Sequence, residues 1–254
     1  MDFGYSKIGS IIKGPINQEE LKNFMLQPGH FDLLKDVFLT LTLSSGNFPY
    51  LNSQDFTRFC KEIKLTDKNI NQSRIDTIIS NVKASKGIDK PKFHNQGALD
   101  LSRPEFFEAL IRVSIAKFKE NAPNPQVVSQ QDAVEAMMNE KLKPNFTPAP
   151  WQVFRDEELW TQKVNLVFHD NEEGLRKVFA KYAKPGLNKI PYEKAVKLLT
   201  TDCSIRLDKF DAIYCYGMSL STCTDLNKLM QNKMLHMSYE EFLEMLGRAA
   251  DVHF

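Results

Sequence analysis

Residues 98–112 read ALDLSRPEFFEALIR, and residues 234–248 repeat the pattern as MLHMSYEEFLEMLGR. Two further matches keep the same order at a similar offset: LLKDVFLTL at 33–41 matches GLRKVFAKY at 174–182, and Leu51 matches Ile190. Three matches in one order indicate that a whole unit is duplicated. Each copy reads as helix, loop, short apolar strand position, acid and helix, a unit that cannot bury its apolar face alone.

This order of elements resembles that of the EF-hand superfamily. The resemblance implies an all-α chain with two tandem EF-hand-like lobes, each made of two degenerate helix-loop-helix units, joined by a proline-rich, partly helical connector. From periodicity and prolines we expect an N-terminal extension at 1–28, lobe 1 at 29–120, the connector at 121–168 with a helix at 129–141, and lobe 2 at 169–254. Four apolar residues are expected to form the short strand contacts between paired loops: Leu51, Leu101, Ile190 and Met237.

The first and third loops lack the ligands that a calcium ion needs. A competent loop supplies side-chain oxygens from positions 1, 3 and 5, a backbone carbonyl from position 7 and a bidentate glutamate at position 12. With Leu51 and Ile190 at the apolar position 8, position 12 is Asp55 in the first loop and Lys194 in the third. One hydroxyl is all that the other side-chain positions offer: Ser44, Gly46, Phe48, Ala183, Pro185 and Leu187. Neither loop is expected to bind calcium.

The second and fourth loops keep the terminal acid, as Glu105 and Glu241, and these two glutamates are the metal candidates of the chain. Both loops are expanded, and neither spaces carboxylates two residues apart near the strand position. Ser102 and Ser238 precede the two acids by three residues, which is the pattern of a capping box. We therefore favour helix capping over ion binding for both glutamates, and expect no metal site.

A more specific resemblance rests on ALDLSRPEFFEALIRV at 98–113, MMNEKLKP at 137–144 and WQVFR at 151–155. These stretches resemble a group of EF-hand-like proteins of ciliates and other flagellated protists. Members of that group are similar to calmodulin in fold, have lost calcium loops, and include proteins similar to components of the ciliary doublet microtubule. The resemblance implies the same surroundings for this chain.

Two functions compete. The first is a non-catalytic, calcium-independent structural component of the axoneme, a doublet microtubule inner or associated protein that binds tubulin and neighbouring filament proteins. Its contact residues are expected in the second loop and among the tryptophans: Lys86, Lys90, Lys92, Phe93, Trp151 and Trp160. The alternative is a regulatory light-chain-like or calcium-sensor-like adaptor that grips a target helix. The nine methionines of the chain favour this alternative, because methionine-rich grooves adapt to partner helices.

Apolar residues recur at helical spacing over residues 151–170. We expect this aromatic stripe to form a helix that docks on one of the two cores. The sharper alternative is a helix that enters the groove of a partner.

Composition excludes several other classes. A net charge of +1 gives no field for nucleic acid and no basic patch for a membrane surface, and no apolar run approaches the roughly 20 residues of a membrane span. The first residues carry no signal-peptide pattern, so we expect the cytoplasm and cytoskeleton and, through the resemblance, the ciliary axoneme.

The motifs of known catalytic classes are missing as well. The sequence holds no phosphate-binding glycine loop, nucleophile elbow or His-Glu-x-x-His motif, so we expect no catalysis and no cofactor. A zinc site would require Cys215, Cys223 and His236 to converge. Without a Cys-x-x-Cys pair, thiols without a metal are the simpler interpretation.

Overall fold

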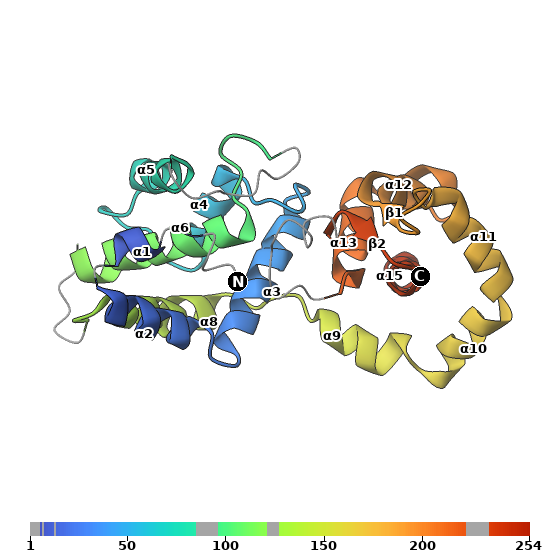
Figure 1. Cartoon of the computed structure of the whole chain (residues 1–254), viewed down its shortest axis with the longest axis horizontal. Coiled ribbons are helices and arrows are strands. Elements are labelled where there is room, and N and C mark those ends of the chain that lie inside the picture. Colours follow the sequence, from blue (N-terminus) through green and yellow to red (C-terminus); the bar gives the residue numbers. More distant parts are fainter. Residues whose placement is uncertain (1–5, 7, 13, 85–95, 121–126, 222–233) are drawn as a thin grey trace. The chain divides into compact units, whose positions relative to one another are not determined.

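The computed structural model of this chain describes residues 6, 8–12, 14–84, 96–120, 127–221 and 234–254 (Figure 1). These residues are predominantly helical, and their β-structure is limited to one two-stranded ladder and one isolated bridge. The all-α expectation is confirmed. Within the described ranges, no helix is long and apolar enough to cross a bilayer.

The chain divides into two compact units, unit 1 at Met1–Pro148 and unit 2 at Ala149–Phe254. The division falls inside the range 121–168, which we expected to be a connector. The helix expected at 129–141 packs into unit 1, whereas the tryptophan-containing segment that follows belongs to unit 2. The range 121–168 is therefore shared between the two units.

Unit 1 contains the helices of the expected lobe 1 together with helices from both flanks. They are α1 (Ile8–Ile11), α2 (Pro15–Met25), α3 (His30–Ser44), α4 (Ser53–Glu62), α5 (Gln72–Lys83), α6 (Arg103–Ile115), the π-helical turn η2 (Ala116–Glu120), α7 (Gln130–Ala136), the π-helical turn η3 (Met137–Leu142) and α8 (Lys143–Asn145). Local signals explain the starts of several helices. The side chains of Asn52, Asn71 and Ser129 each accept a hydrogen bond from the backbone N–H three residues ahead.

The core of unit 1 is built around Phe106. Its ring lies 5.4 Å from the ring of Phe38 and 5.9 Å from that of Phe56, and aromatic pairs at such separations add to the burial term. α7 packs on α6 and α2 and adds Val134 to the same cluster, and Met137, the first residue of η3, belongs to that cluster as well. The N-terminal helices and the helix at 130–142 are thus part of one hydrophobic core.

Unit 2 is also built from helices, with one short two-stranded ladder. Its elements are α9 (Trp151–Val153), the π-helical turn η4 (Phe154–Leu159), α10 (Gln162–Asp170), α11 (Glu172–Tyr182), β1 (Ile190–Pro191), α12 (Tyr192–Lys197), the π-helical turn η5 (Leu198–Asp202), α13 (Lys209–Ser219), β2 (His236–Met237) and α15 (Tyr239–His253). In the view of Figure 1, the segments from α9 to α11 follow an arc around α15.

The strand contacts expected from the repeat are confirmed in both units. Leu51 and Leu101 form an antiparallel bridge, and Ile190 pairs with Met237 in the β1–β2 ladder. The aromatic packing is repeated too, since Phe179 lies 5.7 Å from Phe242, as Phe38 lies from Phe106 in unit 1 at 5.4 Å. The duplication read from the sequence therefore extends to the packing of side chains.

Candidate functional site

The acid positions of the first and third loops do not face a cation site. Asp55 lies at the start of α4, where its backbone N–H donates to the Asn52 side chain at 2.8 Å and its carboxylate pairs with Arg58. Lys194 is exposed on α12. Both positions lie in the first turn of a helix, α4 in the first loop and α12 in the third.

The carboxylate of Glu105, at the end of the second loop, accepts hydrogen bonds from several groups of unit 1. The backbone N–H and the hydroxyl of Ser102 both donate to Glu105 Oε2 at 3.0 Å, so the expected capping contact is present. Two further donors, which the sequence did not indicate, reach the same carboxylate. Lys83 Nζ lies 3.2 Å from both carboxylate oxygens, and Gln96 Nε2 lies 2.8 Å from Oε2.

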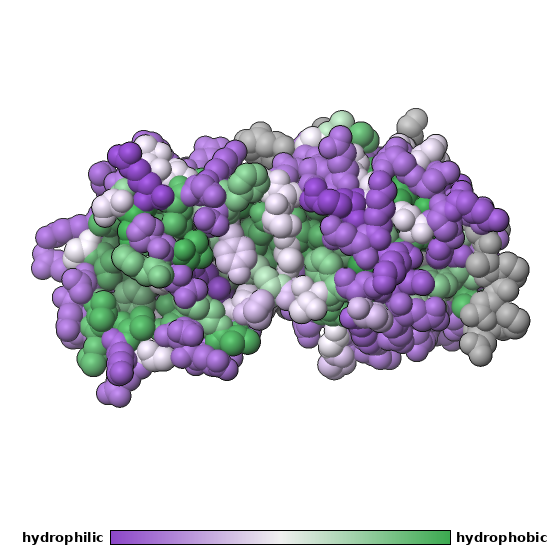
Figure 2. Space-filling model, turned by 180° about the vertical axis from the view of Figure 1, so that it is seen from behind, coloured by the Kyte–Doolittle hydropathy of each residue, from purple (hydrophilic) through white to green (hydrophobic). Residues whose placement is uncertain are grey.

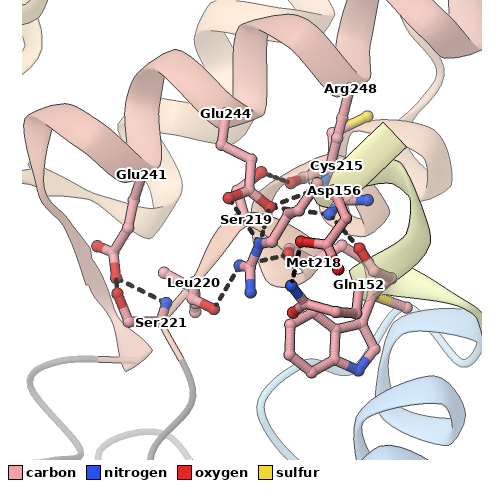
Figure 3. A network of polar contacts seen from close by, with 12 residues as sticks. Gln152, Asp156, Cys215, Met218, Ser219, Leu220, Ser221, Glu241, Glu244 and Arg248 are labelled. Carbon is pink, nitrogen blue, oxygen red and sulfur yellow. Dashed lines mark hydrogen bonds and ion pairs between the residues drawn. The ribbon is translucent and has the colours of Figure 1, made fainter. Parts of the chain in front are cut away.

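Glu241 takes the matching place in unit 2 but uses neutral donors. Ser238 donates its backbone N–H to Glu241 Oε2 at 2.7 Å and accepts from the Glu241 N–H at 3.3 Å, which completes the expected capping box. The other oxygen accepts from the backbone N–H and the hydroxyl of Ser221, at 2.8 and 2.6 Å (Figure 3). The capping prediction is confirmed for both glutamates.

A buried network of charges holds the tryptophan segment to the rest of unit 2. Glu244 on α15, with 5% of its side chain exposed, receives Arg155 Nε at 2.8 Å on both oxygens and Arg248 Nη2 at 2.8 Å (Figure 3). Arg155 also donates to the carbonyls of Met218 and Leu220, both at 3.2 Å. The network therefore joins η4 to α13 and α15, and we call it the arginine clamp.

Aromatic rings complete the clamp. The Arg155 guanidinium lies 4.5 Å from the ring centroid of Trp151, and that of Arg248 lies 4.7 Å from the centroid of Phe154. Arg248 Nη2 also donates to the Trp151 carbonyl at 2.8 Å. Of the expected partner-binding residues, Trp151 is thus engaged within its own unit.

A glycine on α15 makes room for the same segment. Leu159, the last residue of η4, is buried, and a Cβ at Gly247 would overlap its Cδ1 atom. This close approach explains why residue 247 has no side chain in a helix that otherwise uses good helix formers.

The second half of the aromatic stripe is not docked. α10 has no buried residue, and Trp160, Leu166 and Val167 are exposed. The expectation that the stripe as a whole packs on a core is therefore wrong for α10, because only the turn that ends at Leu159 meets a complementary surface. Figure 2 shows hydrophobic side chains on one face of the molecule, and among the described residues most of the large exposed hydrophobic side chains belong to unit 2.

Four of the expected partner-binding residues, Lys86, Lys90, Lys92 and Phe93, lie outside the described residues. The described part of the chain holds no group of three or more His, Cys, Asp or Glu side chains placed to bind a metal ion.

The two buried thiols, Cys60 and Cys215, are not poised for nucleophilic chemistry. Burial raises the pKa of Cys60, and burial together with the nearby Asp211 raises the pKa of Cys215 to about 12. A reactive cysteine needs a lowered pKa, because the thiolate is the nucleophile and the metal ligand. Of the zinc candidates, Cys223 lies outside the described residues.

Comparison with known proteins adds no relative: no family model, no curated protein and no solved structure matches the chain.

Proposed function

We propose that this protein is a non-catalytic structural component of the ciliary axoneme, a doublet microtubule inner or associated protein that binds tubulin and neighbouring filament proteins. Its two units are, in this proposal, EF-hand-like lobes that work without calcium. The assignment to cilia rests only on the sequence resemblance. The structure supports the lobe arrangement and the independence from calcium.

The pairing of loops supports the EF-hand-like arrangement. In each unit, two helix-loop-helix segments meet through a short antiparallel contact, at Leu51–Leu101 and at Ile190–Met237. In each unit the helix after the second of these strand positions begins with a serine-glutamate cap. This is the order of elements that the sequence resemblance implies.

The observation that carries the proposal is that, in both units, side chains and backbone groups of the protein itself occupy the positions where a calcium ion or a target helix would bind. The acids that would hold calcium, Glu105 and Glu241, already accept hydrogen bonds from protein donors. α7 and η3 cover one side of the core in unit 1, and Leu159 is buried against α15 in unit 2. A lobe held in one arrangement by its own chain suits a permanent structural part better than a switch.

This observation also separates the proposal from the adaptor alternative. An adaptor that grips a target helix needs an open apolar groove, and a sensor needs a metal-dependent change of that groove. We therefore expect the combined Trp151 and Trp160 fluorescence to stay constant when calcium is titrated from about 0.1 µM to 1 mM, the range that covers sensor loops and weak extracellular sites. A saturable change at micromolar calcium would favour the adaptor.

Exposed apolar side chains on unit 2 supply a surface for a partner. Trp160 lies 6.2 Å from Phe168 between ring centroids, and beside them α10 exposes Leu166 and Val167. Contiguous exposed apolar side chains mark interaction surfaces in soluble proteins. In the proposed function, a neighbouring axonemal protein covers this part of unit 2.

The decisive experiment is to tag the protein in a ciliated cell, isolate the axonemes and wash them with about 0.5 M salt, where exposed ionic contacts are strongly screened. We expect the protein to stay with the doublets. Release by salt, or absence from cilia, would overturn the proposal and leave a partner-binding protein of another compartment.

The second loop can be tested in the same assay. Reversing its charge at Lys86, Lys90 and Lys92 is expected to reduce binding to axonemes at low salt, before the wash, without unfolding unit 1. The matched control reverses three exposed lysines elsewhere in unit 1: Lys61, Lys64 and Lys68. Equal binding of both variants at low salt would remove the loop from the contact surface, and a melted unit 1 would show that the loop belongs to the core.

A further inference from the structure

Lys83 is the last residue of α5, and its ammonium group points into the second loop. Nζ lies 2.7 Å from the backbone carbonyl oxygen of Asp100 and 3.2 Å from both carboxylate oxygens of Glu105. The two charged side chains are largely removed from solvent, with 19% of Lys83 and 7% of Glu105 exposed. Three oxygens of the loop therefore converge on one cation.

The three oxygens are those that calcium uses at the same loop positions. With Leu101 at the apolar position 8, Asp100 is position 7 and Glu105 is position 12. A calcium ion is bound by the backbone carbonyl of position 7 and by both carboxylate oxygens of position 12. Gln96, at position 3, also donates to the Asp100 carbonyl, at 2.6 Å, and to Glu105 Oε2, at 2.8 Å.

We propose that the Lys83 ammonium is an internal cation that takes the place of the divalent ion in the second loop. It joins the end of α5 to the strand position and to the start of α6, as a bound ion joins the two helices of a calcium loop. Unlike an ion, it cannot dissociate. The α5–α6 pair is thereby held in one arrangement at any calcium concentration.

The charges of the described loop residues agree with this assignment. Among the described residues, Glu105 is the carboxylate that pairs with the ammonium, and the two opposite charges offset each other.

The matching position in unit 2 shows what happens without the lysine. The repeat that aligns residue 98 with 234 aligns Lys83 with Ser219, whose hydroxyl donates to the Cys215 carbonyl at 2.7 Å. Glu241 instead accepts from the N–H and hydroxyl of Ser221. The two copies therefore satisfy the same loop acid by different means, one with a charge and one with neutral donors.

This inference goes beyond the proposed function, because it rests on the loop geometry alone and stands whether or not the protein is found in cilia. Hydrogen–deuterium exchange of the full-length protein, read separately for peptides of α5, α6 and α13, tests it. Lys83→Met keeps most of the apolar stem and removes the charge. We expect protection in α5 and α6 to fall about 30-fold, the effect of losing hydrogen bonds to a charged group, while α13 is unchanged.

Two further variants make the test specific for charge. Lys61→Met on the exposed face of α4 is the control for a lysine-to-methionine change, and it should leave protection unchanged. Glu105→Gln in the Lys83→Met background should cost about tenfold less than in the wild-type background, because the cation is already gone. If Lys83→Met behaves like Lys61→Met, or if the two changes at the loop are additive, the proposal is overturned.

A calcium titration decides whether Lys83 stands in the place of the ion. In Lys83→Ala the side chain no longer fills the position, and we expect millimolar calcium, in the range of weak natural sites, to restore at least threefold of the lost protection in α5 and α6. The wild-type protein should not respond. A variant that loses protection but gains none with calcium would show an ordinary buried ion pair and would overturn the assignment.

Discussion

The arginine clamp predicts that one arginine fastens the tryptophan segment to unit 2. Arg155 donates to both oxygens of Glu244 and to two backbone carbonyls of the α13 end. A hydrogen bond to a charged group contributes about 1.5–3 kcal/mol, but Arg248 still pairs with Glu244 when Arg155 is gone, so no buried charge is left alone. We therefore expect Arg155→Met to lower the free energy of unfolding of unit 2 by about 2–3 kcal/mol.

This loss would lower the midpoint of thermal unfolding of unit 2 by on the order of 10 °C. The assay uses the full-length protein in a Trp160→Phe background, so that Trp151 is the one tryptophan that reports. Arg155 stacks on the Trp151 ring, and its removal should shift the emission of Trp151 to longer wavelength before global unfolding.

The chain offers a matched control. Arg176 pairs with Glu172 at 2.7 Å and lies over the ring of Tyr239 at 4.4 Å, so it repeats the chemistry of Arg155, but 60% of its side chain is exposed. Arg176→Met is expected to leave the midpoint unchanged, because solvent screens exposed pairs. Equal shifts for the two variants, or an unchanged Trp151 spectrum in Arg155→Met, would refute the clamp.

Two further pairs of variants test the duplicated architecture. Glu105→Gln and Glu241→Gln should each cost about 2 kcal/mol, because both oxygens of each carboxylate accept from protein donors and a glutamine amide nitrogen cannot accept; a denaturation midpoint equal to that of the wild type in either variant would contradict this account. Gly247→Ala should destabilise unit 2 by about 1–3 kcal/mol through overlap with Leu159, while Gly174→Ala, where nothing lies within 4 Å of the added Cβ, should stabilise it by about 0.5–1 kcal/mol. Stabilisation by both alanines would show that Leu159 is not held against α15.

Features that depend on short stretches of the chain were predictable. The capping boxes need only a serine and a glutamate three residues apart, and the strand contacts of Leu51 and Ile190 follow from their place in the repeat. Helical periodicity likewise predicted α7 with η3 as a helix, because apolar residues recur there three and four apart.

Features that depend on distant partners were not predictable. Arg155 and Glu244 are 89 residues apart, and nothing in either neighbourhood indicates that they meet. Lys83 reads in the sequence as an ordinary basic residue at the end of a helix, where it suits the helix dipole. Its role emerges only when the fold brings Asp100 and Glu105 to the same place. For α10 the sequence predicted a contact that the structure does not contain. Apolar residues at helical spacing predict the helix, but they do not reveal whether another surface covers its apolar face.

The arginine clamp explains how a duplicated unit acquires a new attachment without a new core. Both copies keep a pair of a buried glutamate and an arginine four residues apart on the last helix of the repeat, Glu108 with Arg112 in unit 1 and Glu244 with Arg248 in unit 2, each with an N–O distance of 2.8 Å. A carboxylate has two oxygens and accepts more than one donor, so such a pair can take a second arginine, whose remaining N–H groups donate to the carbonyls of Met218 and Leu220. In unit 2 that second arginine is Arg155, which brings with it the turn that ends at Leu159. A small addition to an existing pair thus suffices to fix a segment from outside the repeat, while α10, which follows that turn, has no buried residue.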